Sequence, residues 1–482
     1  MATKSSPHEF GSIGNPTRRT AVSFETILRP FIMNRANSSR NSPALIIITL
    51  LLNHPGNPMV ASSPTKAAAV QANLTAQFSQ SNSHKISSLP TGSVIVFGSG
   101  DCGQLGMGED LVTCPRPKRH PFFEGKGIVS VAAGGLHTLA LSNNGHVFSW
   151  GCNDEKALGH SAQEFTVSRV HGLDEEFIVQ ITCGDSISAA LTSTGKIYTW
   201  GTFRDSKGVI GVKSTSGKET SEPSEHSEFH IVPTLLKELS HLRVKKISAG
   251  ANHLLALTDD GEVYAWGCGE QGQLGRRVLE RHKRLALHPT RITPRRHRAH
   301  GGIVSMVCGS YHSFLLAADG TVFSVGLNNY GQLGLGDFED RLVPEEIPSD
   351  VWQGHKIVDL DAGEHHSIAL SASGAVFVFG RADSHQMGLP HDSESRAHNV
   401  PVLNPALSSI AQIASGSNHL LAISSDRHQI FSWGYGEMGQ LGHDEEADEP
   451  VPKRIEAFSA TTKFLDISAG GQHSVVLMTK NQ

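Results

Sequence analysis

The chain has 482 residues, with 49 glycines, six cysteines, 18% charged residues and a formal net charge of −5. This balance excludes a uniformly basic nucleic-acid binder, and the absence of any C-x-x-C pair argues against a structural zinc site or a dense disulfide framework. The longest apolar run, residues 44–52, is far shorter than the roughly 20 residues of a membrane-spanning helix, so we expect no membrane partner and a reducing compartment.

Residues 1–90 differ in charge and composition from the rest of the chain. They carry eight basic and two acidic residues, whereas the remainder carries 33 basic and 44 acidic residues. They are rich in Ser, Asn, Ala, Pro and Thr without a helical or alternating apolar period, which predicts a disordered, weakly basic N-terminal extension. Such an arm is able to lie on DNA phosphates or an acidic protein surface, although a tail without a partner explains the same composition.

Two further interpretations of this extension stay open. From Met33 the sequence has a basic start and an apolar core, as in a signal peptide. Its distance from the first methionine and the scattered cysteines argue against secretion. Alternatively, translation starts at Met59, and residues 1–58 are an erroneous gene prediction or an unstructured extension.

From residue 91 onward one pattern recurs: Gly-x-x-His, an apolar strand, a tight turn, a second apolar strand with an aromatic residue, and glycine. Seven copies follow one another at intervals of 50 to 66 residues, which indicates a repeat array. In the copy that begins at Gly184, Ile187 replaces the histidine. The other copies begin at Gly134, Gly250, Gly309, Gly363, Gly416 and Gly470.

Each copy consists of strands and turns. Residues 139–151 and 255–267 show two apolar strands joined through Asn-Gly and Asp-Gly, which favour the positive φ of a tight hairpin. Small four-stranded units bury their faces only against one another. The first copy (92–98) holds just the closing half of the pattern and the last (470–477) just the opening half. We therefore predict an all-β fold, a seven-bladed β-propeller over residues 91–479 that strands from both chain ends close.

Two long intervals between copies contain insertions. Residues 213–229 are polar and poor in apolar side chains, which indicates a loop. Residues 276–300 hold nine basic residues and a single acid, Glu280. This second insertion is either a solvated surface loop with a helical turn or a patch that binds phosphates or an acidic partner.

The repeated histidines point to architecture, because one histidine at the same point of each blade is expected to satisfy a neighbouring backbone group. Motifs for nucleophilic, metal or phosphate chemistry (Gly-x-Ser-x-Gly, H-E-x-x-H and the P-loop) do not occur in the sequence. We expect no cofactor, no metal, no covalent catalysis and no small-molecule substrate, and we place recognition on the loops of one rim. The histidines concerned are His137, His253, His312, His366 and His419.

The alternation of Gly-x-x-His with Trp-Gly and with G-Q-L-G (103–106, 272–275, 331–334 and 439–442) resembles the repeat of the regulator of chromosome condensation family over residues 91–479. That repeat also occurs in ubiquitin ligases, a plant ultraviolet receptor and bacterial inhibitors, so it implies the fold and not the function. Residues 97–110, 150–159 and 200–211 more specifically resemble the chromatin-bound branch that exchanges guanine nucleotide on the small GTPase Ran. The receptor is disfavoured because four of the five tryptophans occupy blade or strand positions.

In that branch a β-wedge presses on the GTPase near its phosphate-binding loop, and FRDSKGVIG (203–211) resembles this segment. The resemblance implies that the wedge displaces the loop while Asp185 and Asp205 compete for its positive groups. The catalytic residues implied are Asp185, Phe203, Arg204, Asp205, Ser206, Lys207 and Gly208. The partner-binding residues implied are Asp101, Asn252, His365 and His473.

Two positions depart from the family pattern. Ile187 removes the repeat histidine beside Asp185, and Asn252 stands where the best-studied member has an acid, so it keeps an acceptor but loses the charge. Both departures favour an alternative, a non-catalytic propeller that scaffolds protein partners. A third class, an organellar or secreted relative, would show cleavage of residues 1–58.

The resemblance also implies a location. An exchange factor of this branch sits on nucleosomes in the nucleus and supports nucleocytoplasmic transport and mitosis. We expect the basic arm and the second insertion to meet histones and DNA phosphates. The insertion residues concerned are Arg276, Arg277, Arg295, Arg296 and Arg298.

Overall fold

The computed structural model describes residues 81–161, 164–212, 229–295, 297–390 and 395–479. The predictions for residues 1–80, including those on Met59 and the signal-like stretch, lie outside these ranges. Residues 81–87 form a helix, so the predicted disorder is wrong for this segment. The reason is tertiary contact: Asn82 Nδ2 donates to Ser193 O at 3.3 Å, and Ile86 packs against a blade core.

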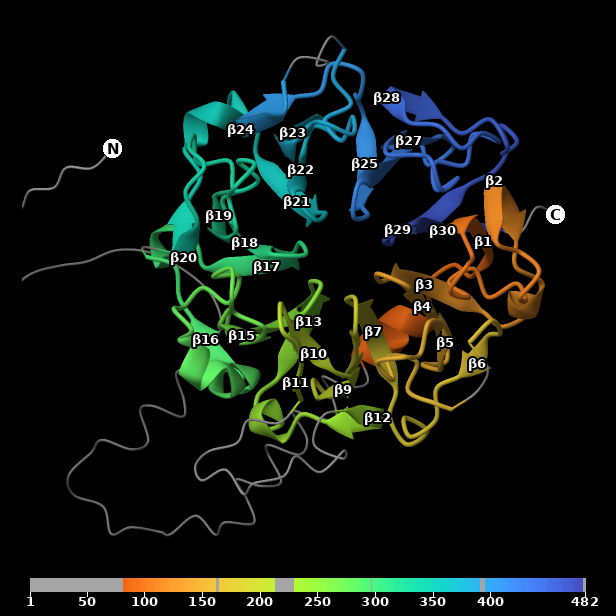
Figure 1. Cartoon of the computed structure of the whole chain (residues 1–482), viewed down its shortest axis with the longest axis horizontal. Coiled ribbons are helices and arrows are strands. Elements are labelled where there is room, and N and C mark those ends of the chain that lie inside the picture. The colour runs from red at the N-terminus through yellow and green to blue at the C-terminus, as the bar shows by residue number, and fades with distance from the viewer. Residues whose placement is uncertain (1–80, 162–163, 213–228, 296, 391–394, 480–482) are drawn as a thin grey trace, which may run out of the picture. The chain divides into compact units, whose positions relative to one another are not determined.

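Within the described residues, seven four-stranded antiparallel sheets form the blades, and Figure 1 shows their arrangement around a centre. A single pairing, Gly92 with Ile128, joins two of them into one continuous sheet. The innermost strands, which contact one another around the ring, are β3 (Ile128–Ala133), β7 (Ile178–Cys183), β13 (Val244–Ala249), β17 (Ile303–Cys308), β21 (Ile357–Ala362), β25 (Ile410–Ser415) and β29 (Phe464–Ala469).

The remaining strands follow outward in three layers. The second strands are β4 (His137–Ser142), β8 (Ile187–Thr192), β14 (His253–Thr258), β18 (His312–Ala317), β22 (His366–Ser371), β26 (His419–Ser424) and β30 (His473–Thr479). The third strands are β5 (Val147–Gly151), β9 (Ile197–Gly201), β15 (Val263–Gly267), β19 (Val322–Gly326), β23 (Val376–Arg381), β27 (Ile430–Gly434) and β1 (Gly92–Ser99). The outer strands are β6 (Ser168–Arg169), β12 (His230–Leu235), β16 (Thr290–Ile292), β20 (Arg341–Glu346), β24 (Ala397–Leu403), β28 (Glu449–Arg454) and β2 (Thr113–Arg119).

Both ends of the described chain build the closing blade. β1 runs antiparallel to β30 in continuous register, from Gly92 opposite Thr479 to Gly98 opposite His473. Hydrogen bonds therefore close the ring without a covalent link, and the predicted seven-bladed, end-closed propeller is confirmed.

The ring has two faces, which we name by their connections. On the loop face, short Gly-x-x segments such as 184–186 join the innermost to the second strand of each blade. On the turn face, hairpin turns such as 193–196 join the second to the third strand. Short 3-10 helices complete the connections: η1 (Pro121–Phe123), η3 (Lys237–Leu239), η4 (Glu280–Leu287), η5 (His297–His300) and η6 (Ser349–Trp352).

Polar side chains on the innermost strands join several neighbouring blades. Asp466 accepts hydrogen bonds from Ser130 Oγ at 2.9 Å and from Val131 N at 3.1 Å. Asp361 accepts one from Ser415 N at 2.8 Å. These bonds satisfy backbone groups that face the central channel, where pairing within the blade has ended.

The repeat histidines join neighbouring blades through a hydroxyl. His253 Nε2 lies 2.8 Å from Ser313 Oγ, and this hydroxyl donates to Gln273 O at 2.9 Å. Because the hydroxyl proton is used on the carbonyl, Nε2 must donate to the hydroxyl. The expected architectural role is confirmed for His137, His312 and His419 as well, whose Nε2 atoms lie 2.8 Å from a neighbouring serine, although the partner is a hydroxyl and not the expected backbone group. His473 makes the same contact with Thr138 at 2.7 Å. For His366 the expectation is wrong, because neither of its ring nitrogens has a hydrogen-bond partner among the described residues.

This arrangement explains the glycine of Gly-x-x-His. A Cβ atom at Gly250 would lie 2.3 Å from Cε1 of His253, and one at Gly416 would lie 2.4 Å from Cε1 of His419. Only glycine lets the backbone pass this close to the imidazole that the same motif supplies. The motif is thus one packing unit rather than two separate signals.

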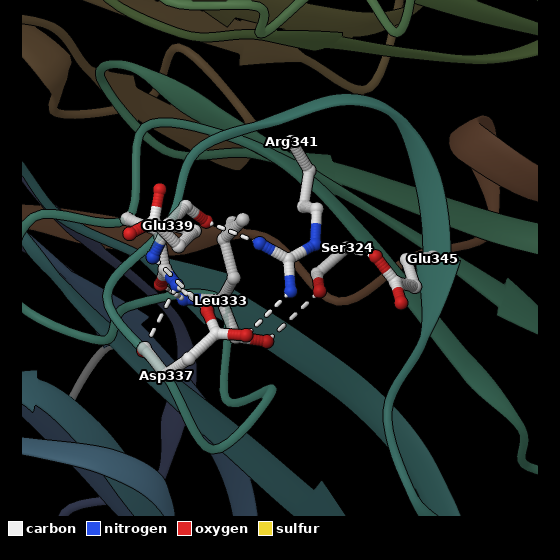
Figure 2. A network of polar contacts seen from close by, with 7 residues as sticks. Ser324, Leu333, Asp337, Glu339, Arg341 and Glu345 are labelled. Carbon is white, nitrogen blue, oxygen red and sulfur yellow. Dashed lines mark hydrogen bonds and ion pairs between the residues drawn. The ribbon is translucent and has the colours of Figure 1, made fainter.

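The ordinary connection between third and outer strands is a closed polar loop. In the blade of β19 and β20, Asn328 Oδ1 accepts from Leu333 N at 2.9 Å and its Nδ2 donates to Asp337 O at 3.0 Å. Arg341 donates to the Asp337 carboxylate and to the carbonyl oxygen of Glu339, both at 2.6 Å. Figure 2 shows these side chains around the loop. The loop is therefore closed by its own side chains, and Gly336 N also donates to Asn399 O of the next blade at 2.9 Å.

Candidate functional site

One blade lacks this closed loop and carries a small hairpin on the loop face. After β9, strands β10 (Phe203–Asp205) and β11 (Gly208–Gly211) pair with each other through the two-residue turn of Ser206 and Lys207. Gly208 has φ +121°, a conformation that favours glycine. We call residues 203–211 the β-wedge, following the sequence prediction for this segment.

Phe203 anchors this hairpin. It stands two residues after the glycine that ends the third strand, the position from which Asn153 and Asn328 bond to their own loops in two other blades. Its ring is 2% exposed and packs with Trp266 in the core between blades. The prediction that Phe203 is itself a catalytic residue is therefore wrong, because a buried ring does not reach a partner; it anchors the wedge.

Polar contacts hold the base and the tip of the wedge. Arg204 N donates to Asn252 Oδ1 at 2.9 Å, and the Arg204 guanidinium pairs with Glu155. At the tip, Ser206 donates through its N–H and its hydroxyl to the two carboxylate oxygens of Glu270, at 2.9 and 2.8 Å. The wedge is thus ordered before any partner arrives.

Asp205 is not a free acid. Its side chain is 2% exposed, Lys283 Nζ lies 2.6 Å from Oδ2, and Oδ1 accepts the N–H of Lys207 at 2.9 Å. The expectation that Asp205 competes for positive groups of a GTPase is therefore wrong, because both oxygens already have partners within the chain. Arg204, Ser206 and Lys207 remain exposed.

Asp185 stands beside the wedge at the mouth of the central channel. It is the second residue of its Gly-x-x segment, and its N–H donates to Ala251 O at 2.9 Å, as in neighbouring segments. Ile187 is buried and leaves this backbone contact intact. Three segments further around the mouth, Glu364 supplies a second acid at the position equivalent to Asp185. The other segments have glycine, alanine or serine at this position.

A pocket of about 600 Å³ opens between Asp185 and the wedge. Enclosure by the channel walls, and after it the charge of Glu364, raises the pKa of Asp185 to about 6. Water still reaches the carboxylate from the loop face, since the residue is exposed. The charged side chains that line the pocket are Asp154, Glu155, Asp185, Arg204, Asp205 and Glu364. Because Glu155 pairs with Arg204 and Asp205 with Lys283, the acidic character of the pocket comes from Asp154, Asp185 and Glu364, which suit a cationic side chain of a partner.

The four predicted partner-binding residues are in different surroundings. Asn252 orients the wedge, as described above. His365 is half-buried between Tyr311 and Tyr330, with ring centroids 5.8 and 5.0 Å away, and burial lowers its pKa. Asp101 is exposed, and its carboxylate accepts from Ser99 Oγ at 2.6 Å, which lowers its pKa.

His473 does not face a partner. It is 0% exposed, its Nε2 lies 2.7 Å from Thr138 Oγ1, and burial lowers its pKa to about 3. The prediction of partner binding by His473 is therefore wrong: it performs the same blade-joining task as the other repeat histidines.

The basic insertion does not form one patch. The guanidinium of Arg276 donates to the carbonyl oxygens of Ala265 and Ala286, at 2.9 and 3.3 Å, so its expected nucleic-acid role is replaced by a structural one. Arg277 is exposed at one end of β16, whereas Arg295 and Arg298 are exposed beyond the other end. Arg296 lies outside the described residues.

Within the described ranges, no group of three or more His, Cys, Asp or Glu side chains is placed to hold a metal ion. No helix in the same ranges is long and apolar enough to cross a membrane.

Comparison with known proteins places the propeller in a family. Residues 93–476 match the RCC1-like domain. The chain is 35% identical over 414 residues to the human regulator of chromosome condensation (82% of this chain, 93% of the relative) and 31% identical over 439 residues to the guanine nucleotide exchange factor SRM1 of Saccharomyces cerevisiae (79% and 86%). The crystal structure of Saccharomyces cerevisiae Prp20p, described with its binding to Gsp1p and histones, superposes with a TM-score of 0.73 at 31% identity (82% and 93%).

Similar identity alone does not separate functions within this family. The ultraviolet-B receptor of Arabidopsis thaliana is 34% identical over 396 residues, covering 81% of this chain and 82% of the receptor. In the present chain all five tryptophans are buried, at 0 to 4% exposure. Features outside the shared repeat, the wedge and the acidic pocket, therefore distinguish this chain within the family better than overall identity does.

Proposed function

The chain belongs to the RCC1-like domain family, and we propose that within it the protein is a guanine nucleotide exchange factor for the small GTPase Ran. The observation that carries the proposal is the preordered β-wedge beside the acidic pocket of Asp185 and Glu364 on the loop face. The family membership of the exchange factor SRM1 supports it.

The proposed mechanism involves no covalent step. A GTPase holds its nucleotide through backbone N–H groups, a lysine and magnesium around the phosphates. A protein that binds the nucleotide-free GTPase more tightly than the loaded one weakens nucleotide binding by the same factor. Here the exposed tip of the wedge, Ser206 and Lys207, would press against the phosphate-binding loop. Asp185 and Glu364 would attract its basic side chains.

We further propose that the protein acts in the nucleus on chromatin. The support is the histone binding in the description of Prp20p, together with the exposed arginines Arg277, Arg295 and Arg298. The basic arm of residues 1–80 is the second candidate for nucleosome binding, and it lies outside the described ranges.

The decisive experiment measures release of a fluorescent GDP analogue from Ran with catalytic amounts of the full chain, with an unrelated small GTPase as control. We expect acceleration with Ran alone, and a large loss when Asp185→Ala is combined with deletion of residues 204–208. No acceleration by the wild-type chain, with loading of Ran verified, would reject exchange and favour a non-catalytic scaffold.

A further inference from the structure

The first part of the basic insertion contacts the wedge directly. η4 packs beside β11, and Leu287 at its end lies in the same buried cluster as Phe203 and Ile210. Insertion and wedge therefore share one core, although η4 begins 69 positions after the wedge glycine Gly211 in the sequence.

Charge pairs add to this apolar contact. Lys283 of η4 lies 2.6 Å from the Asp205 carboxylate, whose side chain is 2% exposed. Glu280 of η4 lies 2.6 Å from Lys207 Nζ at the wedge tip. A buried carboxylate that loses its partner is strongly unfavourable, so the Asp205 position depends on Lys283, whereas the exposed pair of Lys207 and Glu280 contributes little.

Glu270 holds the tip from the connection that precedes η4. Its two oxygens accept the N–H and the hydroxyl of Ser206, at 2.9 and 2.8 Å. A two-residue turn whose first residue is bonded twice to a neighbouring blade has little freedom to swing. The wedge angle is therefore set from outside the wedge.

We propose that Glu270 and Lys283 form a clamp that positions the β-wedge for nucleotide exchange, with Lys283 supplied by the first half of the basic insertion and Glu270 by the connection that precedes it. The inference rests on the proposed function. An ordered wedge spends no binding free energy on its own ordering when it meets the GTPase. Glu270 and Lys283 are positioning residues, since neither needs to touch the partner.

The test compares Lys283→Met with the matched control Arg284→Met, which removes a neighbouring exposed charge of the same 3-10 helix. We expect Lys283→Met to lower the maximal rate of GDP release about tenfold, equivalent to about 1.4 kcal/mol. The KM for Ran should change less, because Asp185 and Glu364 keep their places. Arg284→Met and the charge-conserving Lys283→Arg should stay within about twofold of wild type.

Two further measurements separate positioning from a general loss of structure. The double variant Asp205→Asn with Lys283→Met should recover part of the rate, because the neutral amide no longer needs a counter-charge. Thermal unfolding should show the propeller intact, while the amides of Ser206 and Lys207 should exchange with deuterium faster in Lys283→Met than in wild type.

The outcomes are distinct. Wild-type exchange rates in Lys283→Met, or unchanged deuterium exchange of the wedge, would overturn the clamp. If the wild-type chain itself does not accelerate GDP release, the proposed function fails, and deuterium exchange of the wedge alone then decides whether the clamp exists.

Discussion

His366 and Leu420 hold the two positions of a blade boundary that at five other boundaries pair a histidine with a hydroxyl. Leu420 directly follows His419, the position that supplies Ser313, Ser367 or Ser474 elsewhere. Among the described residues, neither ring nitrogen of His366 has a hydrogen-bond partner, and the side chain is 0% exposed. At the boundary of Ile187 and Leu254 both partners are apolar and buried, so no polar group is left over.

This difference predicts opposite effects of the same substitution. His366→Ile reproduces the apolar pairing at Ile187 and should leave the free energy of unfolding unchanged or raise it by about 1 kcal/mol, because an unpaired polar group disappears. His312→Ile breaks the bond to Ser367 and should lower it by about 1–3 kcal/mol. Urea unfolding of both variants measures these free energies. If His366→Ile lowers the free energy of unfolding as much as His312→Ile does, the unpaired imidazole of His366 does not destabilise the propeller.

The fold was predictable because every blade repeats one packing unit. Gly-x-x-His encodes both the imidazole and the absence of a Cβ beside it, so each copy signals the same geometry. The half copies at the ends signalled the closing pair of β1 and β30 for the same reason. Because the pattern repeats, the pairing of the two chain ends could be predicted from short local motifs.

The site was less predictable, because its contacts join segments far apart in the chain. From the sequence alone, Asp205 is expected to be an exposed loop acid, whereas in the structure it pairs with Lys283, 78 residues later. Arg276 is expected to belong to a basic patch, whereas its guanidinium donates to backbone carbonyls. Glu364, by contrast, was open to prediction, because it holds the same place in its Gly-x-x-His segment as Asp185.

The channel gives a pH dependence with a definite sign. Burial raises the pKa of Asp361 to about 7 from an ordinary value near 4. Below about pH 4 the carboxyl is protonated in both states; above that the unfolded chain ionises first, so stability falls as pH rises towards 7. Asp361→Asn should therefore stabilise the propeller relative to wild type at pH 8 and lose this advantage at pH 4. Thermal unfolding of both proteins at the two pH values measures it; an advantage independent of pH would contradict the assignment.

Asn252 offers a test of the wedge base. Its Oδ1 accepts the N–H of Arg204 at 2.9 Å, and a carboxylate oxygen accepts as well as an amide oxygen. Asn252→Asp should therefore retain exchange within about threefold, whereas Asn252→Leu should lower it about tenfold, since leucine offers no acceptor to the Arg204 N–H. The stimulated rate of GDP release is the measurement. An equal decrease in both variants would assign the role to the amide Nδ2 instead.

We expect Asp185 to contribute to nucleotide exchange through its negative charge and not by stabilising the conformation of its loop. Asp185→Asn keeps the size of the side chain and should lower kcat/KM for GDP release about tenfold. Ser417→Ala, at the equivalent place in another segment of the channel mouth, is the matched control and should have little effect. Raising the salt concentration should reduce the difference between wild type and Asp185→Asn, because screening weakens the attraction at the open mouth. A difference that does not respond to salt would point to a structural role for Asp185.

Substitutions at the two ends of the basic insertion should affect nucleosome binding differently. Arg276→Met removes a half-buried guanidinium that bonds to backbone carbonyls, so we expect a lower melting temperature, and a change in binding only through that destabilisation. Arg295→Met with Arg298→Met leaves the fold intact and should weaken binding in gel shifts and reduce its salt dependence, with a slope change of about one for each DNA phosphate that is no longer neutralised. Arg277→Met tests the opposite end of β16 in the same assay. If neither exposed group changes the salt slope, the insertion does not bind DNA, and residues 1–80 become the segment to delete next.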